Sequence, residues 1–238
     1  MSERLGTALE SADGKSRYVR RLFSTIADRY DFITSFLSYG QDRRWKRRLI
    51  SMARLQPGIR VLDLACGTGD ITYALHDAGA TATGLDITLR MVELAQGKRP
   101  SGQRPAFLVG DMMHLPFGDG VFQVVTTGYG IRNVPVIAPA LGEIHRVLRP
   151  GGVLLSLDFN RPGNPIARAV YLTYLTVVGS TLGLVLHGDP DTYRYIPESI
   201  RRYPGAEAVC AAARAEGFGA CEWVPVLGGL MAIHRAVR

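Results

Sequence analysis

The 238-residue chain is predicted to fold as one α/β domain with a doubly wound, Rossmann-like, mainly parallel sheet. Three observations predict this fold class. Short apolar runs alternate with helical patterns from residue 59 to residue 159, and a glycine-rich turn follows the first run. The last two apolar runs, 220–225 and 230–236, are joined near Gly228-Gly229, which permits an antiparallel hairpin. The last strand is therefore expected to be antiparallel.

The elements follow in order along the chain. Residues 1–15 are polar and expected to be mobile, and apolar residues at helical spacing then predict two or three helices before residue 55, broken near Ser38-Tyr39-Gly40. Strands are expected at 59–64, 81–85, 106–109, 121–127 and 152–159. Helices are expected from the glycine turn through Leu75, from an N-cap at Thr88 to about Gly97, and over 135–148 and 206–215.

Composition limits the class of protein. The apolar fraction of 47% and charged fraction of 21% are those of a globular domain and exclude disorder. Three widely spaced cysteines predict neither a disulfide framework nor a zinc site, so a reducing, cytoplasmic setting is expected. No secretory signal is expected, because the first residues have no apolar core. The net charge of +7, densest over residues 43–48, fits nucleic acid, an anionic membrane surface or plain solubility.

The turn VLDLACGTGD (61–70) is the most informative segment. Gly67 and Gly69 lie where a strand meets a helix, so a cofactor can approach the main chain and free helix amides there. Asp86, at the end of the next strand, can accept both hydroxyls of a ribose. A dinucleotide site would have a third glycine where Thr72 stands. Asp63 instead suits an amino group and a sulfonium, which favours S-adenosylmethionine over NAD.

A second acid follows the third expected strand. Asp111 could accept a hydrogen bond from the exocyclic amine of an adenine, while Met112 covers a face of the ring. The alternative is an ordinary turn aspartate, which its position at a third successive strand end disfavours.

The chain resembles the ubiquinone/menaquinone biosynthesis C-methyltransferases over nearly its full length. The motifs that carry the resemblance are FSTIADRYD (23–31), WKR (45–47), LDLACGTGD (62–70), LPF (115–117), GIRNV (130–134), RVLRPGG (146–152), DTYRY (191–195) and ESIR (198–201), with Pro204 beyond. The glycine turn and RPGG are generic to methyltransferases, whereas RNV and YRY…ESI are more specific to quinol methylation.

The resemblance implies the cofactor S-adenosylmethionine, with S-adenosylhomocysteine as product, and a lipid quinol as substrate. Cofactor contacts are expected at Thr68, Asp86 with the following Ile87, Asp111 and Met112. Family members often have a serine where this chain has Gly128, so only the backbone of Gly128 can contact the cofactor. The resemblance also implies four segments of one domain, namely a helical cap (1–56), a cofactor-binding core (57–160), a substrate lid (161–204) and a C-terminal helix with hairpin (205–238).

Methyl transfer to a ring carbon needs no metal, and the five histidines have no metal-ligand spacing. The resemblance suggests that Arg132 and an ordered water promote quinol deprotonation. A guanidinium stays ionised, so we expect it to stabilise the phenolate, with Asn133 orienting the water or hydroxyl. Tyr193 and Tyr195 could line the ring pocket or belong to the core.

Residues 169–186 contain no charged side chain and are just long enough to raise a transmembrane span. Their threonines and tyrosines, with Gly179 and Gly183, weaken helix continuity and hydrophobicity. An apolar lid or channel for an isoprenoid tail is favoured, with peripheral contact to the inner face of a membrane. A plain core element, a homodimer interface or membership of a quinone-synthesis complex stays open.

Two other functions compete with quinol methylation. A nucleic-acid methyltransferase fits the positive charge, but exocyclic-amine methylators usually carry an Asp/Asn-Pro-Pro-aromatic turn where this chain reads TGYG (127–130). No nucleic-acid partner is therefore expected. The other is a non-catalytic cofactor-binding scaffold. Either a benzoquinol or a naphthoquinol ring suits the sequence, and His114 and His187 are candidate bases.

Overall fold

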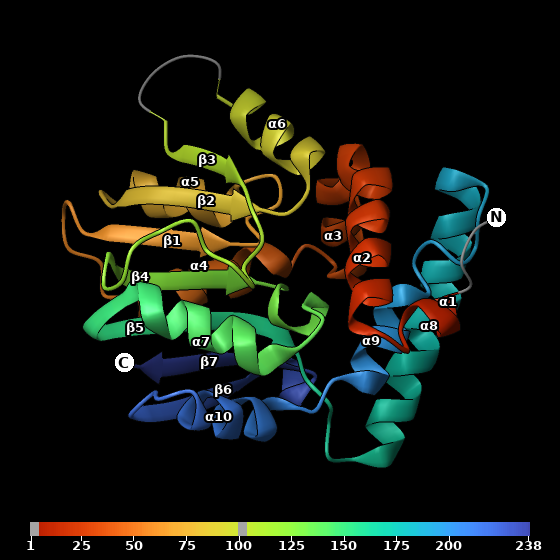
Figure 1. The fold of residues 1–238 in the computed structure, drawn as a ribbon. Helices are drawn as coiled ribbons and strands as arrows, with labels where there is room; N and C mark the ends of the chain where they lie inside the picture. Colours follow the sequence, from red (N-terminus) through yellow and green to blue (C-terminus); the bar gives the residue numbers. More distant parts are fainter. Residues whose placement is uncertain (1–4, 100–103) are drawn as a thin grey trace.

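The structure, a computed structural model, describes residues 5–99 and 104–238. A single sheet with the strand order β3-β2-β1-β4-β5-β7-β6 forms its centre (Figure 1). The strands are β1 (Arg60–Leu64), β2 (Thr81–Asp86), β3 (Ala106–Val109), β4 (Phe122–Gly128), β5 (Leu148–Phe159), β6 (Ala220–Val226) and β7 (Met231–Val237). The strands β1 to β5 pair in parallel, and β7 runs antiparallel to both β5 and β6. The predicted doubly wound sheet with an antiparallel last strand is confirmed.

The helices are α1 (Leu5–Ala8), α2 (Ala12–Ile26), α3 (Tyr30–Leu37), α4 (Asp42–Met52), α5 (Asp70–Asp77), α6 (Leu89–Gly97), α7 (Ile137–Val147), α8 (Pro165–His187), α9 (Tyr195–Arg202) and α10 (Ala206–Ala215), with short 3₁₀ turns η1 (Ala27–Arg29), η2 (Ile131–Asn133) and η3 (Leu227–Gly229). Most helices alternate with these strands, but α1 to α3 precede the alternating part of the chain, and α8 and α9 are additional helices before α10.

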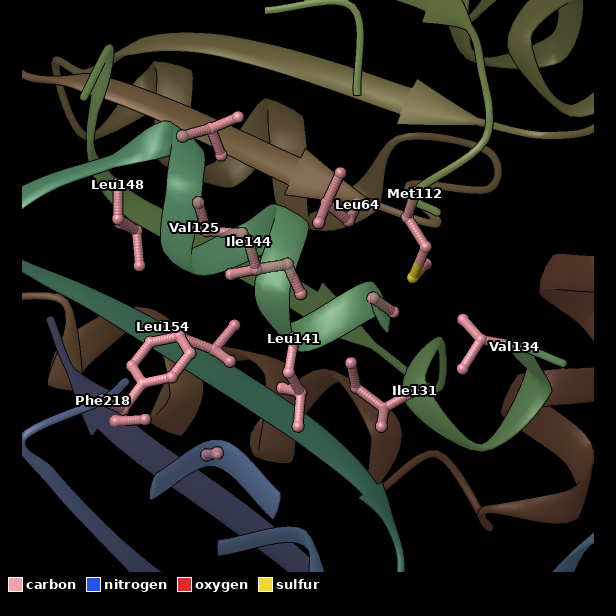
Figure 2. Packing of buried hydrophobic residues seen from close by; sticks show 14 of the residues in the cluster. Leu64, Met112, Val125, Ile131, Val134, Leu141, Ile144, Leu148, Leu154 and Phe218 are labelled. Carbon is pink, nitrogen blue, oxygen red and sulfur yellow. The ribbon is translucent and has the colours of Figure 1, made fainter. Parts of the chain in front are cut away.

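Both faces of the sheet are covered, as a parallel sheet requires. Leu62 and Leu64 of β1 face α7 and α10, and Figure 2 shows this layer, with Ile144 of α7 over Val125 of β4. Val61, the intervening residue of β1, faces the opposite layer of α4 and α5. Successive side chains of a strand point to opposite faces, which places Asp63 on the α4/α5 side with Val61.

A third group of helices stands at the carboxyl ends of the parallel strands. Figure 1 shows α2 and α3 beside these strand ends, with α8 and α9 beyond them. Val19 and Ile33 from α2 and α3 pack in one buried cluster with Tyr193 and Tyr195. The edge of the sheet where its ligands bind is thus covered by helices from both ends of the chain.

Helix α8 is continuous over 23 residues, so the expectation that its glycines weaken the helix is wrong. Asn164 caps it by accepting from the amides of Ile166 and Ala167. The two glycines are buried contact points: a Cβ on Gly179 would lie 3.3 Å from the Cβ of Tyr193, and one on Gly183 would lie 2.5 Å from the backbone oxygen of Asp189, which follows the helix. They permit close packing that larger residues would prevent.

Three further expectations are corrected. Residues 5–15 are not a mobile tail, because α1 and the first turn of α2 occupy much of that stretch; residues 1–4 lie outside the described residues. Cys210 and Cys221 form a disulfide, since α10 turns back onto β6 and brings their Cα atoms to 5.2 Å. Thr88 does occupy the N-cap of α6, but its side chain makes no capping hydrogen bond.

Candidate active site

Two neighbouring cavities lie between the strand ends and the covering helices. The first, which we call the cofactor cleft, has an empty volume of about 700 Å³ and is open to solvent. The second, the apolar cavity, has an empty volume of about 1390 Å³ and is lined mainly by carbon atoms. Phe23, Tyr30 and Tyr129 line both, so the two cavities adjoin at these three rings.

Seven of the residues singled out from the sequence line the cofactor cleft. They are Gly67, Asp86, Ile87, Asp111, Met112, Gly128 and Asn133. They come from the last residues of β2 and β4, from the loops that follow β1, β2 and β3, and from η2, all at one edge of the sheet. The parallel topology therefore brings together side chains that are up to 66 positions apart in the sequence, from Gly67 to Asn133.

The two acids of the cleft already hold the main chain around it. Asp86 accepts from the amides of Gly67 and Thr88, both at 2.8 Å, and Asp111 accepts from the amide of Met113 at 2.9 Å. Burial raises the pKa of Asp86, while these backbone donors oppose the shift. A carboxylate oxygen has two lone pairs, so Asp86 can still accept from a ligand's hydroxyls.

The glycine turn leaves room for a ligand at its surface. Gly67 has a φ of +53°, and a Cβ built there would have only Tyr30 near it, at 3.6 Å. Tyr30 lines the cleft, so a side chain at Gly67 would project toward the space that the cleft encloses. These features fit a nucleoside: acids for its hydroxyls and amine, accessible main chain, and the apolar surface of Met112.

Three of the expected cofactor contacts do not line the cleft. Asp63 is buried behind the turn, where the hydroxyls of Thr72 and Thr126 donate to its carboxylate at 2.6 and 2.8 Å. Burial raises its pKa to about 6, and these two donors oppose that shift. Gly69 is instead the N-cap residue before α5, with a φ of +86°.

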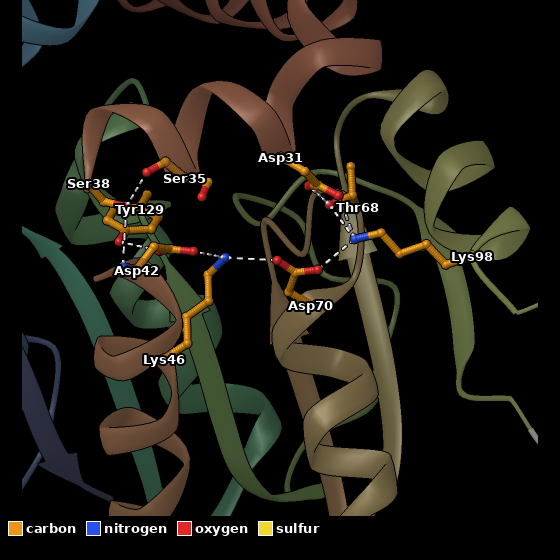
Figure 3. Close-up of polar contacts among 9 residues, drawn as sticks. All are labelled: Asp31, Ser35, Ser38, Asp42, Lys46, Thr68, Asp70, Lys98 and Tyr129. Atoms are coloured by element: carbon orange, nitrogen blue, oxygen red, sulfur yellow. Dashed lines mark hydrogen bonds and ion pairs between the residues drawn. The ribbon is translucent and has the colours of Figure 1, made fainter. Parts of the chain in front are cut away.

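Thr68 takes part in a polar network that ties α3 and α4 to the glycine turn (Figure 3). Its hydroxyl donates to Asp31 at 2.5 Å and accepts from Lys98 at 3.1 Å. Lys98 also pairs with Asp31 and with Asp70, at 2.8 and 2.6 Å. Asp70 in turn pairs with Lys46 of α4 at 3.1 Å. The network thus clamps the helices over the turn from the outer side of the cleft.

Arg132, on η2, forms a buried ion pair that the sequence did not suggest. Its Nε lies 3.0 Å from Asp158 of β5, and its backbone amide donates to the same carboxylate at 3.0 Å. The two side chains are 5% and 0% exposed. Burial raises the pKa of Asp158, and the charge of Arg132 opposes this. The guanidinium also lies 4.8 Å from the ring centroid of Phe159.

Asn133 and Tyr195 complete this cluster. Arg132 Nη1 donates to Asn133 Oδ1 at 2.8 Å and to the Ser199 hydroxyl at 3.1 Å. The Tyr195 hydroxyl donates to the same Asn133 oxygen at 2.9 Å, and the Asn133 amide group donates to the backbone of Tyr129. Within the described part of the chain, Arg132 Nη2 makes no hydrogen bond. Because Arg132 lines the apolar cavity, its Nη2 can donate a hydrogen bond to a ligand there.

The apolar cavity contains both tyrosines predicted to line a ring pocket. Tyr193 and Tyr195 line it, together with residues of α2, α3 and α8. The Tyr193 hydroxyl lies 2.8 Å from His187 Nε2, and burial raises the Tyr193 pKa to about 12. His114, the other candidate base, is exposed and lines neither cavity.

Sequence reasoning missed Tyr129, the residue between the two cavities. Its φ of +62° lies in the left-handed region, which costs a non-glycine residue about 1 kcal/mol or more. Two contacts hold it there: its amide donates to Leu157 at 2.7 Å, and its hydroxyl donates to Asp42 at 2.7 Å. An aromatic residue between Gly128 and Gly130 at a strand end was the available signal.

Solved structures share this fold. A methyltransferase of Thermotoga maritima aligns with a TM-score of 0.64 at 18% identity, over 92% of this chain and 99% of that chain. The Haemonchus contortus phosphoethanolamine N-methyltransferase 2, solved with S-adenosyl-L-methionine, aligns with a TM-score of 0.62 at 15% identity, over 82% of this chain and 52% of that chain. At these identities the likeness shows the fold.

Sequence comparisons give the family. Residues 11–238 match the model of the ubiE/COQ5 methyltransferase family. A demethylmenaquinone methyltransferase of Thermus thermophilus is 40% identical, over 90% of this chain and 98% of its own length. A ubiquinone/menaquinone biosynthesis C-methyltransferase of Ectopseudomonas mendocina is 37% identical, over 94% and 90%. With the fold and the cleft, these matches identify an S-adenosylmethionine-dependent methyltransferase. The chain belongs to the ubiE/COQ5 methyltransferase family.

Proposed function

We propose that this enzyme transfers a methyl group from S-adenosylmethionine to a ring carbon of a polyprenylated quinol. The observation that carries the proposal is the pair of adjoining cavities, one lined by acids and accessible main chain, the other apolar with one arginine. The relatives named demethylmenaquinone methyltransferase favour a naphthoquinol ring over a benzoquinol.

The cofactor is assigned to the cleft. Asp86 would accept from the ribose hydroxyls, Asp111 from the adenine amine, and Met112 would cover the adenine ring. Gly67 and Gly128 would offer main chain, while Ile87 supplies apolar surface. Asp63 would act indirectly, by holding Thr72 and Thr126 and so the turn above it.

When bound, S-adenosylmethionine supplies an electrophilic methyl group on its sulfonium. The chain's task is to hold the quinol carbon in line with that methyl and to lower the cost of forming a phenolate. A carbon–carbon bond forms as the sulfur–carbon bond breaks, and the ring carbon then loses its proton. Arg132 Nη2 would stabilise the phenolate oxygen, and Asn133, held by Tyr195 and Arg132, would position the hydroxyl.

Arg132 acts here as an electrostatic group and not as a base. A guanidinium does not lose its proton at physiological pH. Asp158, fully buried, holds Arg132 in place through an ion pair with its guanidinium and a hydrogen bond from its backbone amide. The phenolic proton would therefore leave to water at the boundary of the two cavities, with the resulting anion stabilised by Arg132.

The apolar cavity and α8 suit the isoprenoid tail. Rings of Tyr171 and Tyr174 on α8 line the cavity, and Tyr174 stacks against Tyr39 at a centroid distance of 6.1 Å. Tyr39 is 77% exposed and Leu227 is 49% exposed, although both line the cavity. They mark the cavity's opening to the outside, through which a tail longer than the cavity would extend.

We further propose that the enzyme works in the cytoplasm, where a reducing environment would open the Cys210–Cys221 disulfide, and touches the inner face of the membrane with α8. This helix is long and apolar enough to cross a membrane, by length and composition. Its outward side chains are exposed, which for so large an apolar surface marks an interaction site. They are Ile166, Val170, Val177, Leu184 and Val185. Phe32 and Phe36 of α3 are also exposed, although neither lines the apolar cavity.

One assay tests the proposed reaction. The enzyme is incubated with methyl-labelled S-adenosylmethionine and, in parallel, reduced demethylmenaquinol, a demethylated benzoquinol, RNA and DNA. We expect label in a quinol, with the naphthoquinol preferred. Label in nucleic acid alone would favour the nucleic-acid alternative. Cofactor binding by calorimetry without label in any substrate would favour the scaffold alternative.

A second experiment tests the membrane proposal. Sedimentation with vesicles of neutral and anionic lipid should recover the enzyme, and Val185→Lys should reduce the bound fraction. Leu89→Lys is the matched control, because Leu89 is 60% exposed on α6, away from α8. Equal binding by both variants would contradict the proposal. A concentration-dependent dimer that Val185→Lys dissociates, without vesicle binding, would assign this face to a second copy.

A further inference from the structure

One side chain joins the start of helix α2 to the turn that carries Arg132 and Asn133. Lys15 Nζ donates to the backbone oxygen of Arg132 at 3.0 Å and to that of Val134 at 2.6 Å. These two carbonyls stand on either side of Asn133. A single ammonium therefore fixes the main chain of η2 at both ends of the residue pair assigned to the quinol.

The start of α2 is built to present this lysine. Ser11 caps the helix by accepting from the amide of Gly14 at 3.0 Å, and the Lys15 amide donates to the Ser11 backbone at 2.9 Å. A Cβ on Gly14 would lie 2.5 Å from a backbone oxygen of α1, so α1 and α2 are closely packed here. Lys15 is thus held by a capped helix end that is itself braced.

We propose that Lys15 is a positioning residue for methyl transfer: its ammonium holds η2 so that the Arg132 guanidinium faces the apolar cavity and Asn133 stays beside it at the cofactor cleft. The inference rests on the proposed quinol methylation. Lys15 lines neither the cofactor cleft nor the apolar cavity, so it acts through η2 and does not touch the ring.

Charge adds to this role. The charged groups that face Lys15 are Arg132 of η2, Asp158 of β5 and Arg202 of α9. Burial, followed by repulsion from Arg132, lowers the Lys15 pKa to about 8; Asp158 opposes the shift, and Arg202 adds to it. Below that pH, the group of Lys15, Arg132 and Asp158 carries a net charge of +1 (two cations and one anion), which favours a phenolate nearby.

Loss of the Lys15 proton weakens both effects. A neutral amine keeps N–H donors, but its hydrogen bonds to the two carbonyls are no longer charge-assisted. The net charge of the three groups falls to zero. Methyl transfer should therefore depend on Lys15 ionisation in a way that a purely structural contact would not.

The experiment measures kcat against pH with a short-tailed, dithionite-reduced demethylmenaquinol. The variants are Lys15→Met, which removes the ammonium, and Lys15→Arg, which keeps a permanent charge. Arg17→Met is the matched control, because Arg17 is exposed on the same helix and its loss also removes one positive charge. Calorimetry gives the S-adenosylmethionine Kd, and thermal melting shows that each variant is folded.

We expect Lys15→Met to lower kcat by about 10- to 100-fold, the loss typical of a displaced catalytic group, with the cofactor Kd changed by less than about twofold. Lys15→Arg should recover most of the activity, and Arg17→Met should match the wild type. The ratio of wild-type to Lys15→Arg kcat should fall as pH rises through about 8, because only the wild type loses a proton there. This ratio cancels the ionisation of the quinol itself.

The outcomes separate the two proposals. A wild-type enzyme that methylates no quinol would overturn the proposed function, and the role of Lys15 with it. An active wild type with an equally active Lys15→Met would overturn the role of Lys15 alone. If Lys15→Met does not fold, the wild-type to Lys15→Arg ratio still decides, and a ratio independent of pH would overturn the inference.

Discussion

Replacing Arg132 by methionine tests the buried ion pair and the catalytic assignment together. The substitution keeps the volume of the aliphatic stem but leaves Asp158, which is fully buried, without its cation. Removing one partner of a buried pair costs about 3–5 kcal/mol of unfolding free energy. For a chain of this length, 1 kcal/mol moves Tm by about 2–4 °C, so Tm should fall by about 6–20 °C.

The deficit should depend on pH. Burial already raises the Asp158 pKa, and without Arg132 nothing of comparable strength opposes it. A carboxyl whose folded-state pKa lies above its unfolded value contributes stability at low pH and loses it as pH rises through the raised pKa. The Tm gap between the wild type and Arg132→Met should therefore narrow on acidification.

A double variant separates stability from catalysis. Arg132→Met with Asp158→Asn removes both charges, so neither is left buried and unpaired, and it keeps a side-chain oxygen that can accept from the backbone amides that Asp158 serves. Scanning calorimetry should find the Tm of the double variant within about 5 °C of the wild type. Methyl transfer should be low in both the single and the double variant, because both lack the guanidinium. The S-adenosylmethionine Kd should hardly change in either variant, because Arg132 lines the apolar cavity and not the cleft.

The reasoning would be refuted in three ways. A single variant that loses less than about 1 kcal/mol would show that Asp158 does not depend on Arg132. Tm losses that add in the double variant would show that the two residues do not act as a pair. A large rise in the cofactor Kd would show that Arg132 belongs to the cofactor site.

Other predictions concern the core, the cleft and the disulfide. Asp63→Asn removes a buried carboxyl whose folded-state pKa, about 6, lies above its ordinary value. The unfolding free energy of the wild type should therefore fall by up to about 3 kcal/mol as pH rises from 4 to 7. In pH-dependent melts, the variant should not show that part of the fall. A wild-type curve that the variant reproduces would contradict this. Gly67→Val should weaken S-adenosylmethionine binding at least about tenfold (about 1.4 kcal/mol) in calorimetry. Gly58→Val is the control, because Gly58 also has a positive φ but open space around it, and its Kd should be unchanged. Equal losses of affinity in the two variants would instead indicate general backbone strain. The Cys210–Cys221 disulfide closes a short loop, so its reduction should lower the unfolding free energy by about 2–3 kcal/mol. Urea titrations with and without reductant measure this difference, and identical curves would show that the pair is not oxidised.

Much of the fold followed from local pattern. The helix 206–215 and the strand 106–109 match their predicted bounds, because turn residues and apolar runs mark them on both sides. The antiparallel hairpin followed from its short joint. The helical structure of residues 5–15 did not follow from local pattern, because their contacts are made far along the chain: Lys15 donates to the carbonyls of Arg132 and Val134, and Arg202 donates to that of Leu9.

The candidate site was predictable in its strand-end acids and less so in its supports. Asp86 ends β2, and Asp111 and Arg132 follow the ends of β3 and β4, which any doubly wound sheet brings to one edge. Asp63 was predicted to lie in the cleft because it precedes the glycines. A strand that is apolar on both faces has no alternating pattern, so the sequence does not show to which face of the sheet the Asp63 side chain points. Asp158 was visible as a lone charge in an apolar strand, but only the folded chain pairs it with Arg132.

The two cavities should respond in opposite ways to ionic strength, because the polar network of Figure 3 holds the glycine turn of the cofactor cleft and not the apolar cavity. Lys98, Asp31 and Asp70 are 31–48% exposed, so dissolved ions screen the clamp over the glycine turn. The apolar cavity is held by carbon contacts, which excluded salts such as sulfate strengthen. In concentrated sulfate the enzyme should therefore bind an isoprenoid tail more tightly and S-adenosylmethionine more weakly. A buffer salt chosen for solubility would thus also change which of the two ligands stays bound.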